Sequence, residues 1–227
     1  ALDSGAGQIE QGLVVTRSGY ADPELQGHGN IQQLQSTHPL PDESSLAAGE
    51  AVVNFLSRAP ARARFLVLIS GGASSLAEVP APGVNAQGLA QLNRWLLGSG
   101  LDIHAINRIR RACSQIKGGR LVRYLDGRPA RVLLISDVQG DDPRTIGSGP
   151  LVPAQDEPLR PEELPAELRY LIADIPPVPA PEDFRDVSVE IVASNRQAQQ
   201  AAADQAHLQG LRVYRHDDFL GDEAAEH

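Results

Sequence analysis

A short segment rich in glycine and serine, Ser70-Gly71-Gly72-Ala73-Ser74-Ser75, has the composition of a loop that binds an anion. Adjacent glycines let backbone N–H groups approach a phosphate or carboxylate, and a serine hydroxyl adds a further donor. The segment matches neither a Walker loop nor a G-x-G-x-x-G dinucleotide fingerprint, and a turn selected only for its backbone angles would have the same composition. We expect four of its residues to bind phosphate or substrate: Ser70, Gly71, Gly72 and Ser74.

A second motif, Asn107-x-x-Arg110-Arg111-x-x-Ser114-x-x-Lys117-Gly118-Gly119, has helical spacing. At about 100° per residue its polar members fall on one stripe of a helix over 103–117, beside an apolar stripe that contains Cys113 as a core residue. Arginine binds an oxyanion through two parallel bonds and lysine binds it as a point charge, whereas the structural alternative is a solvated basic face. We expect Arg110 and Lys117 to be catalytic, and three residues to bind substrate or phosphate: Asn107, Ser114 and Gly118.

A third motif, Ser136-Asp137-Val138-Gln139-Gly140-Asp141-Asp142, is followed by Gly147-Ser148-Gly149-Pro150. Three carboxylates so close in sequence supply the oxygen ligands that Mg²⁺ prefers, although turns rich in Asp and Gly are also common. We expect Asp137, Asp141 and Asp142 to bind Mg²⁺, with Asp137 also catalytic, and Ser148 and Gly149 to bind substrate.

His38, which precedes Pro39, is a fourth candidate for substrate binding, and no His/Cys cluster has the spacing of a zinc site. Metal, positive side chains and close positioning are what phosphoryl transfer requires. The motifs together indicate a Mg²⁺-assisted enzyme that acts on a small anion and a phosphate compound.

Apolar, β-branched runs alternate with helical patterns along the chain, which is typical of an α/β fold with a mostly parallel sheet. Ligands of such sheets bind beyond the carboxyl ends of the strands, where the first and third motifs begin. Residues 18–43 read as a loop, and 150–185 as a proline-rich excursion with a short helix near 162–173. The predicted strands cover 12–16, 65–69, 132–135, 187–192 and 212–214, and the predicted helices cover 44–58, 86–98, 103–117 and 195–209.

The chain has 227 residues, and 20 basic against 29 acidic residues give a net charge of −9. This acidic balance argues against a nucleic-acid partner or an anionic membrane surface. One cysteine excludes an internal disulfide and favours a reducing compartment, and no apolar run reaches the ~18 residues of a membrane span. We expect a cytoplasmic protein with small-molecule substrates, and the sequence leaves a homodimer open.

In chain order, from His38-Pro39-Leu40-Pro41-Asp42 to Gly147-Ser148-Gly149-Pro150, these motifs resemble those of the type II glycerate kinases, a family whose complete members carry a C-terminal MOFRL domain. The resemblance implies a Rossmann-like first domain, a smaller second domain, and phosphorylation of D-glycerate at its 2-hydroxyl by ATP and Mg²⁺, which gives 2-phosphoglycerate. Members of the family are often named hydroxypyruvate reductases.

Two departures from the family pattern are small: Ala73 replaces a usual glycine and Ser75 a usual alanine. A lysine segment that the family carries upstream, and a catalytic arginine of its second domain, have no counterpart here. The resemblance therefore implies that residues 1–227 are an N-terminal α/β domain truncated at both ends, without the MOFRL domain. Two alternatives of different kinds are an NAD(P)H-dependent hydroxypyruvate reductase and a non-catalytic module that binds sugar acids, and a kinase for a related acid is a third.

Overall fold

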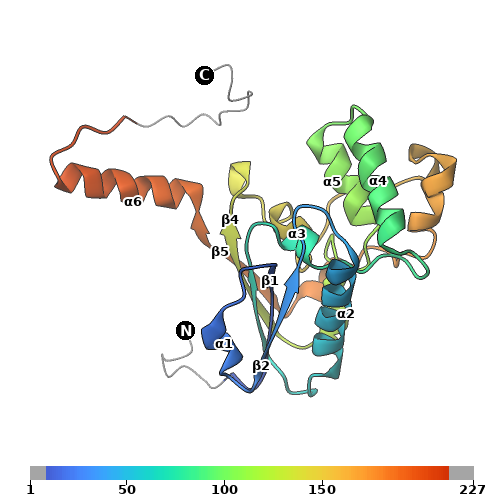
Figure 1. Cartoon of the computed structure of the whole chain (residues 1–227), viewed down its shortest axis with the longest axis horizontal. Coiled ribbons are helices and arrows are strands. Elements are labelled where there is room, and N and C mark those ends of the chain that lie inside the picture. The colour runs from blue at the N-terminus through green and yellow to red at the C-terminus, as the bar shows by residue number, and fades with distance from the viewer. Residues whose placement is uncertain (1–8, 215–227) are drawn as a thin grey trace.

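The computed structural model of the chain describes residues 9–214. Three parallel strands, β3 (Phe65–Ile69), β4 (Ala130–Ser136) and β5 (Val187–Ser194), form one sheet in the order β3-β4-β5. A second parallel pair joins β1 (Gly12–Arg17) to β2 (Ile31–Ser36). These parallel strands and the helices between them confirm the α/β class with a parallel sheet (Figure 1).

Helices connect the strands and cover the sheet unevenly (Figure 1). The longest, α2, begins where the Asp42 side chain accepts hydrogen bonds from the backbone N–H groups of Ser44 and Ser45, which satisfies donors that a helix start leaves unpaired. α4 and α5 lie together to one side of the sheet, and α6 extends away on the other. The α-helices are α1 (Pro23–Gln26), α2 (Glu43–Arg58), α3 (Ala73–Leu76), α4 (Ala86–Gly98), α5 (Ile103–Ala112) and α6 (Asn195–Leu208). The 3-10 helices are η1 (Arg120–Leu125), η2 (Gln139–Asp141), η3 (Ile146–Ser148), η4 (Pro161–Glu163), η5 (Ala166–Ile172) and η6 (Pro181–Phe184).

Two apolar clusters hold these elements together. The first joins β4, through Val132 and Leu134, to α2 and to the segments that follow α5. The second joins α4 and α5 to the proline-rich excursion, with Leu96, Ile109 and Leu168 among its buried members. The proline-rich excursion therefore shares a core with these two helices. This core fixes the position of α5 and of the polar side chains that α5 carries.

One face of the three-stranded sheet is open. A continuously apolar run such as that of β3 is typical of a strand covered on both faces, as parallel strands usually are. Phe65 and Val67 pack on the first cluster, but Leu66 and Leu68 on the opposite face are 54% and 69% exposed. In the described part of the chain the sheet is thus covered on one face only.

Several predicted elements differ in the structure. The predicted loop over 18–43 contains α1 and β2, because pairing with β1 makes a strand of the glutamine-rich segment 31–36 that its own composition does not indicate. The predicted short helix near 162–173 is the pair η4 and η5, and no strand forms at 212–214.

The predicted helix over 103–117 ends five residues early, at Ala112. The chain leaves the helix at Cys113, and Ser114 then pairs with Pro80 in an isolated bridge. The single polar stripe expected from Asn107 to Lys117 therefore does not exist, and its members face different surroundings.

Candidate functional site

The turn after β3 and the first residue after β4 meet at the carboxyl edge of the sheet. The two strands are parallel neighbours, with Ile69 paired to Leu134, so their following loops lie side by side. A Cβ placed on Gly71 would overlap Oδ2 of Asp137, and a Cβ on Gly72 would lie 3.0 Å from the ring of His38. Gly72 also has a φ of +81°, which favours glycine. The structure thus brings together four predicted site residues from three separate motifs.

Serine and glycine residues of the first three motifs continue this arrangement. Oγ of Ser74 lies 2.7 Å from Oγ of Ser148. The N–H groups of Gly118 and Gly119 donate to the carbonyl oxygens of Ser148 and Gly149, at 3.0 and 2.8 Å. The loop after β4 is therefore held between the glycine turn on one side and the segment after α5 on the other.

The three aspartates of the third motif have separate surroundings, which corrects the expected three-carboxylate metal site. Asp137 is exposed and has no hydrogen bond or ion pair with any described residue. Oδ1 of Asp141 accepts from Oγ of Ser136 at 2.6 Å. Hydrogen bonds from Arg144 lower the pKa of the Asp142 carboxyl, which forms an ion pair with that arginine at 2.8 Å. Within residues 9–214, no three His, Cys, Asp or Glu side chains converge on one point.

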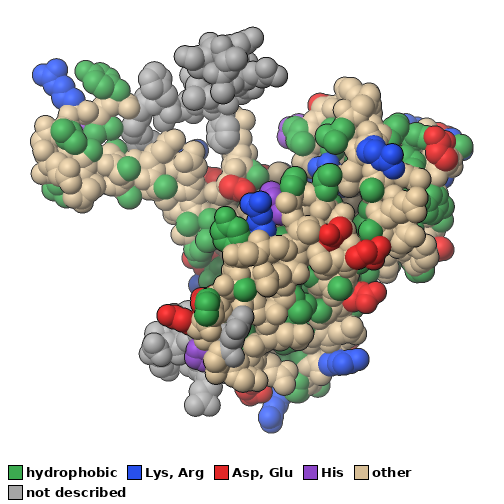
Figure 2. Space-filling model, in the orientation of Figure 1, with side chains coloured by type: hydrophobic (Ala, Val, Ile, Leu, Met, Phe, Trp, Pro, Cys, Tyr) green, Lys and Arg blue, Asp and Glu red, His purple; other side chains and the backbone are tan. Residues whose placement is uncertain are grey.

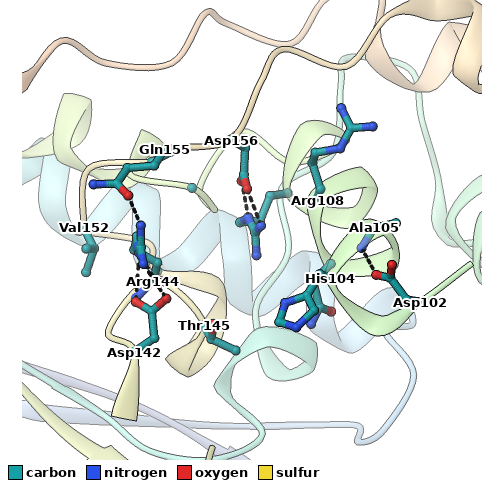
Figure 3. Close-up of a pocket in the computed structure, with 15 residues that line it drawn as sticks. Asp102, His104, Ala105, Arg108, Asp142, Arg144, Thr145, Val152, Gln155 and Asp156 are labelled. Carbon is teal, nitrogen blue, oxygen red and sulfur yellow. Dashed lines mark hydrogen bonds and ion pairs between the residues drawn. The ribbon is translucent and has the colours of Figure 1, made fainter. Parts of the chain in front are cut away.

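A cavity of about 510 Å³ adjoins this edge, between α5 and the loop 142–156 (Figure 3). Its size is in the usual range of small-molecule sites. Four residues predicted from sequence line it, Asn107, Gly118, Asp142 and Gly149. His104 and Thr145, which the sequence analysis did not select, lie in the same cavity (Figure 3).

Three arginines at the cavity wall are already paired with carboxylates of the chain. Nε and Nη2 of Arg111 donate to Asp156 at 2.6 and 2.7 Å. Arg144 donates to Asp142 and to Gln155, and Arg108 pairs with Glu163, which lies outside the cavity. Local spacing does not indicate these pairs, because Arg111 and Arg108 lie 45 and 55 residues from their partners along the chain.

Lys117 and Ser114 lie in the interior, which corrects the expectation that they contact a ligand. Lys117 is 4% exposed and its Nζ forms an ion pair with Glu78, itself 4% exposed. Oγ of Ser114, fully buried, donates to the other oxygen of the same carboxylate at 2.5 Å. In this structure both residues bind the carboxylate of Glu78, which is not part of any of the motifs. These contacts join the segment after α3 to the segment after α5.

Arg110 and Cys113 also point away from the cavity. Nε of Arg110 donates to Oδ1 of Asn93 on α4 at 3.2 Å, and burial lowers the pKa of its guanidinium. Arg110 therefore joins α5 to α4 and does not pair with an anion in this structure. Cys113 is 2% exposed, and burial raises the pKa of its thiol to about 12, in agreement with its prediction as a core residue.

The ion pair of Arg108 and Glu163 predicts a dependence of stability on acid pH. Hydrogen bonds from Arg108 lower the pKa of Glu163 from 4.5 to about 2. The pair therefore stabilises the fold fully above pH 4.5, and this contribution disappears as the pH falls from 4.5 towards 2. In urea unfolding, we expect wild type to exceed Glu163→Gln in stability at pH 7 and to lose most of that advantage by pH 2. A constant difference across this range would contradict the assignment.

Charged side chains of both signs are dispersed over the face seen in Figure 2, with no continuous patch of one sign. Among the described residues no helix combines the length and the apolar character that crossing a membrane requires.

Comparison with known proteins supports a single family. Residues 1–168 match the model of DUF4147, described as a domain of unknown function. A glycerate 2-kinase of Pyrococcus horikoshii is 40% identical over 144 residues, which are 63% of this chain and 32% of that protein. A protein of Agrobacterium vitis with the provisional name hydroxypyruvate reductase is 41% identical over 155 residues, 67% of this chain and 39% of that protein.

A solved structure has the same fold. The crystal structure of glycerate kinase from Thermotoga maritima superposes with a TM-score of 0.74 at 27% identity, over 89% of this chain and 49% of that one. The chain thus spans about a third of the length of the first curated relatives and about half of the solved chain. The resemblance to the glycerate kinases stated from the motifs is confirmed by these matches.

Proposed function

Since the chain belongs to the DUF4147 family, we propose that it forms the substrate-binding α/β part of a glycerate kinase. The proposed reaction transfers the γ-phosphate of ATP to the 2-hydroxyl of D-glycerate and gives 2-phosphoglycerate. Relatives named as glycerate 2-kinases support this proposal, as does the site at the sheet edge.

One observation supports it most directly, the placement of Asp137 beside Gly71 and of His38 beside Gly72. Both side chains are exposed, and Asp137 has no partner among the described residues. A carboxylate and an imidazole beside accessible backbone N–H groups are suited to a small hydroxy acid. The carboxylate can accept the hydroxyl proton, and the N–H groups can bind an anionic group.

Mg²⁺ fits this site through Asp137. Mg²⁺ is usually held by one or two carboxylates together with substrate phosphates, so an exposed aspartate without a partner is a suitable ligand. The second oxygen of Asp141 is the next candidate, whereas Asp142 is committed to Arg144. When bound, the ion would neutralise charge on the phosphate groups.

The other residues of the edge position the substrate. Ser74 and Ser148 share a hydrogen bond, so one hydroxyl remains free to donate to an oxyanion. Ser70 is exposed at the end of β3 and can add a donor there. Because Gly118 and Gly119 hold the carbonyl oxygens of Ser148 and Gly149, they fix the loop that carries Ser148.

The first experiment incubates the protein in its full length with D-glycerate, ATP and Mg²⁺, measures ADP release and identifies the product isomer by ³¹P NMR. We expect ADP release with 2-phosphoglycerate as the product. ADP release with 3-phosphoglycerate would contradict the position of phosphorylation.

A second assay addresses the alternative that the Agrobacterium vitis name raises. NADH oxidation with hydroxypyruvate, without ADP release from glycerate, would replace the kinase proposal by a reductase. Binding of D-glycerate without either activity would favour a non-catalytic module.

A further inference from the structure

The segment 153–159 has no regular structure, and its residues Ala154, Gln155 and Asp156 line one side of the cavity (Figure 3). No backbone–backbone hydrogen bond joins its residues to the rest of the described chain, and Pro153 and Pro158 have no N–H to offer. We call this segment the acidic strap, because it carries Asp156 and Glu157.

Arginines hold the acidic strap in place. Arg111 binds the carboxylate of Asp156 through two parallel bonds, Arg144 donates to the side chain of Gln155, and Arg108 donates to the carbonyl oxygen of Glu157 at 3.4 Å. Figure 3 shows Arg144, from the loop after β4, below Gln155 of the strap, and Arg111 belongs to α5. Leu159 packs against the second apolar cluster and anchors the end of the strap. Residues 153–158 depend on these arginine contacts, which another oxyanion could replace.

The guanidinium of Arg111 is the central group of this arrangement. Its side chain is 13% exposed and lies on a regular helix, whereas its partner Asp156 is 31% exposed and lies on the strap. A buried guanidinium fork binds phosphate in the same two-point geometry as carboxylate. Arg111 is thus a fixed anion receptor, and Asp156 is the more easily displaced ligand.

We propose that the cavity binds the phosphate chain of a nucleoside triphosphate, and that Asp156 competes with it as an internal anion for Arg111. The cavity of about 510 Å³ is larger than a three-carbon acid needs, and Arg144, which is paired with Asp142, places a second guanidinium in its lining. His104, Asn107 and Thr145 supply further donors along its wall. Binding would release the acidic strap from Arg111.

The identity of the ligand, a nucleoside triphosphate, rests on the proposed kinase function. The presence of an anion site in the cavity does not. Its test therefore measures binding without turnover. Inorganic tripolyphosphate is titrated into the protein by calorimetry, without divalent metal, and D-glycerate is titrated separately.

We expect Asp156→Asn to bind tripolyphosphate about tenfold more tightly than wild type, because a neutral amide competes poorly for a guanidinium. Glu157→Gln is the matched control. It removes the same charge from the same strap, but no described residue pairs with the Glu157 side chain. We expect it to change affinity less than twofold, and Arg111→Lys to weaken binding in both backgrounds.

An equal gain of affinity for tripolyphosphate in Asp156→Asn and Glu157→Gln would show a general effect of charge. It would contradict the proposal that Asp156 competes for Arg111. No binding of tripolyphosphate to any variant would overturn the site. If Asp156→Asn is too unstable to titrate, Gln155→Ala tests the same release through Arg144 and is expected to raise affinity by a smaller factor. Tighter binding together with absent glycerate phosphorylation would leave the anion site in place and refute only the kinase proposal.

Discussion

Replacing Lys117 with methionine is expected to lower the free energy of unfolding by about 3–5 kcal/mol, because the change leaves the carboxylate of Glu78 charged and buried without its partner. Glu78 is 4% exposed, and its remaining side-chain donor is the hydroxyl of Ser114. The loss is measured by urea unfolding at neutral pH, followed by far-UV circular dichroism.

Two controls separate this explanation from a general loss of packing. The double variant Lys117→Met/Glu78→Leu removes both charges and should recover most of the lost stability, since an apolar pair of similar volume often replaces a buried ion pair without cost. Arg131→Met breaks the exposed pair with Glu190, whose side chains are 64% and 55% exposed, and should cost less than about 1 kcal/mol. A double variant as unstable as Lys117→Met alone would contradict the ion-pair argument.

In the protein in its full length, assayed for the proposed phosphorylation of glycerate, replacing Gly71 with alanine is expected to lower kcat by about 100-fold, with little change in stability. The new Cβ would overlap Oδ2 of Asp137, so the carboxylate must rotate away from the turn, and a displacement of about 1 Å can cost this factor. Stability should be preserved because Asp137 is exposed and free to move, and because the backbone of Gly71 does not have a positive φ.

If Asp137 acts as proposed, Gly71→Ala and Asp137→Asn impair the same group. Steady-state kinetics of the double variant should therefore show no more loss than the more severe single change. Gly98→Ala, at the end of α4 with no atom within 4 Å of the added Cβ, is the matched control and should leave kcat unchanged. If the kcat of the double variant falls by the product of the two single losses, Gly71 acts independently of Asp137.

The sequence by itself determined the parallel strands β3, β4 and β5 and the motifs at their ends. Apolar, β-branched runs can be stable only in the interior, and parallel strands leave their following loops at one edge. For this reason the glycine turn and Asp137 meet as predicted. The edge strand β2 was missed, because a strand of mostly polar residues owes its conformation to the neighbour with which it pairs.

Only the tertiary structure decided what each charged residue of the second motif contacts. Helical spacing placed Lys117, Arg110 and Asn107 on one face, but the helix ends at Ala112, and the chain beyond it turns towards Glu78. Arg111 meets its partner Asp156 from 45 residues away. A charged side chain is attracted most strongly by the opposite charge that lies nearest to it in a poorly solvated place. The distance between two such charges is set by tertiary packing, which local sequence spacing does not encode.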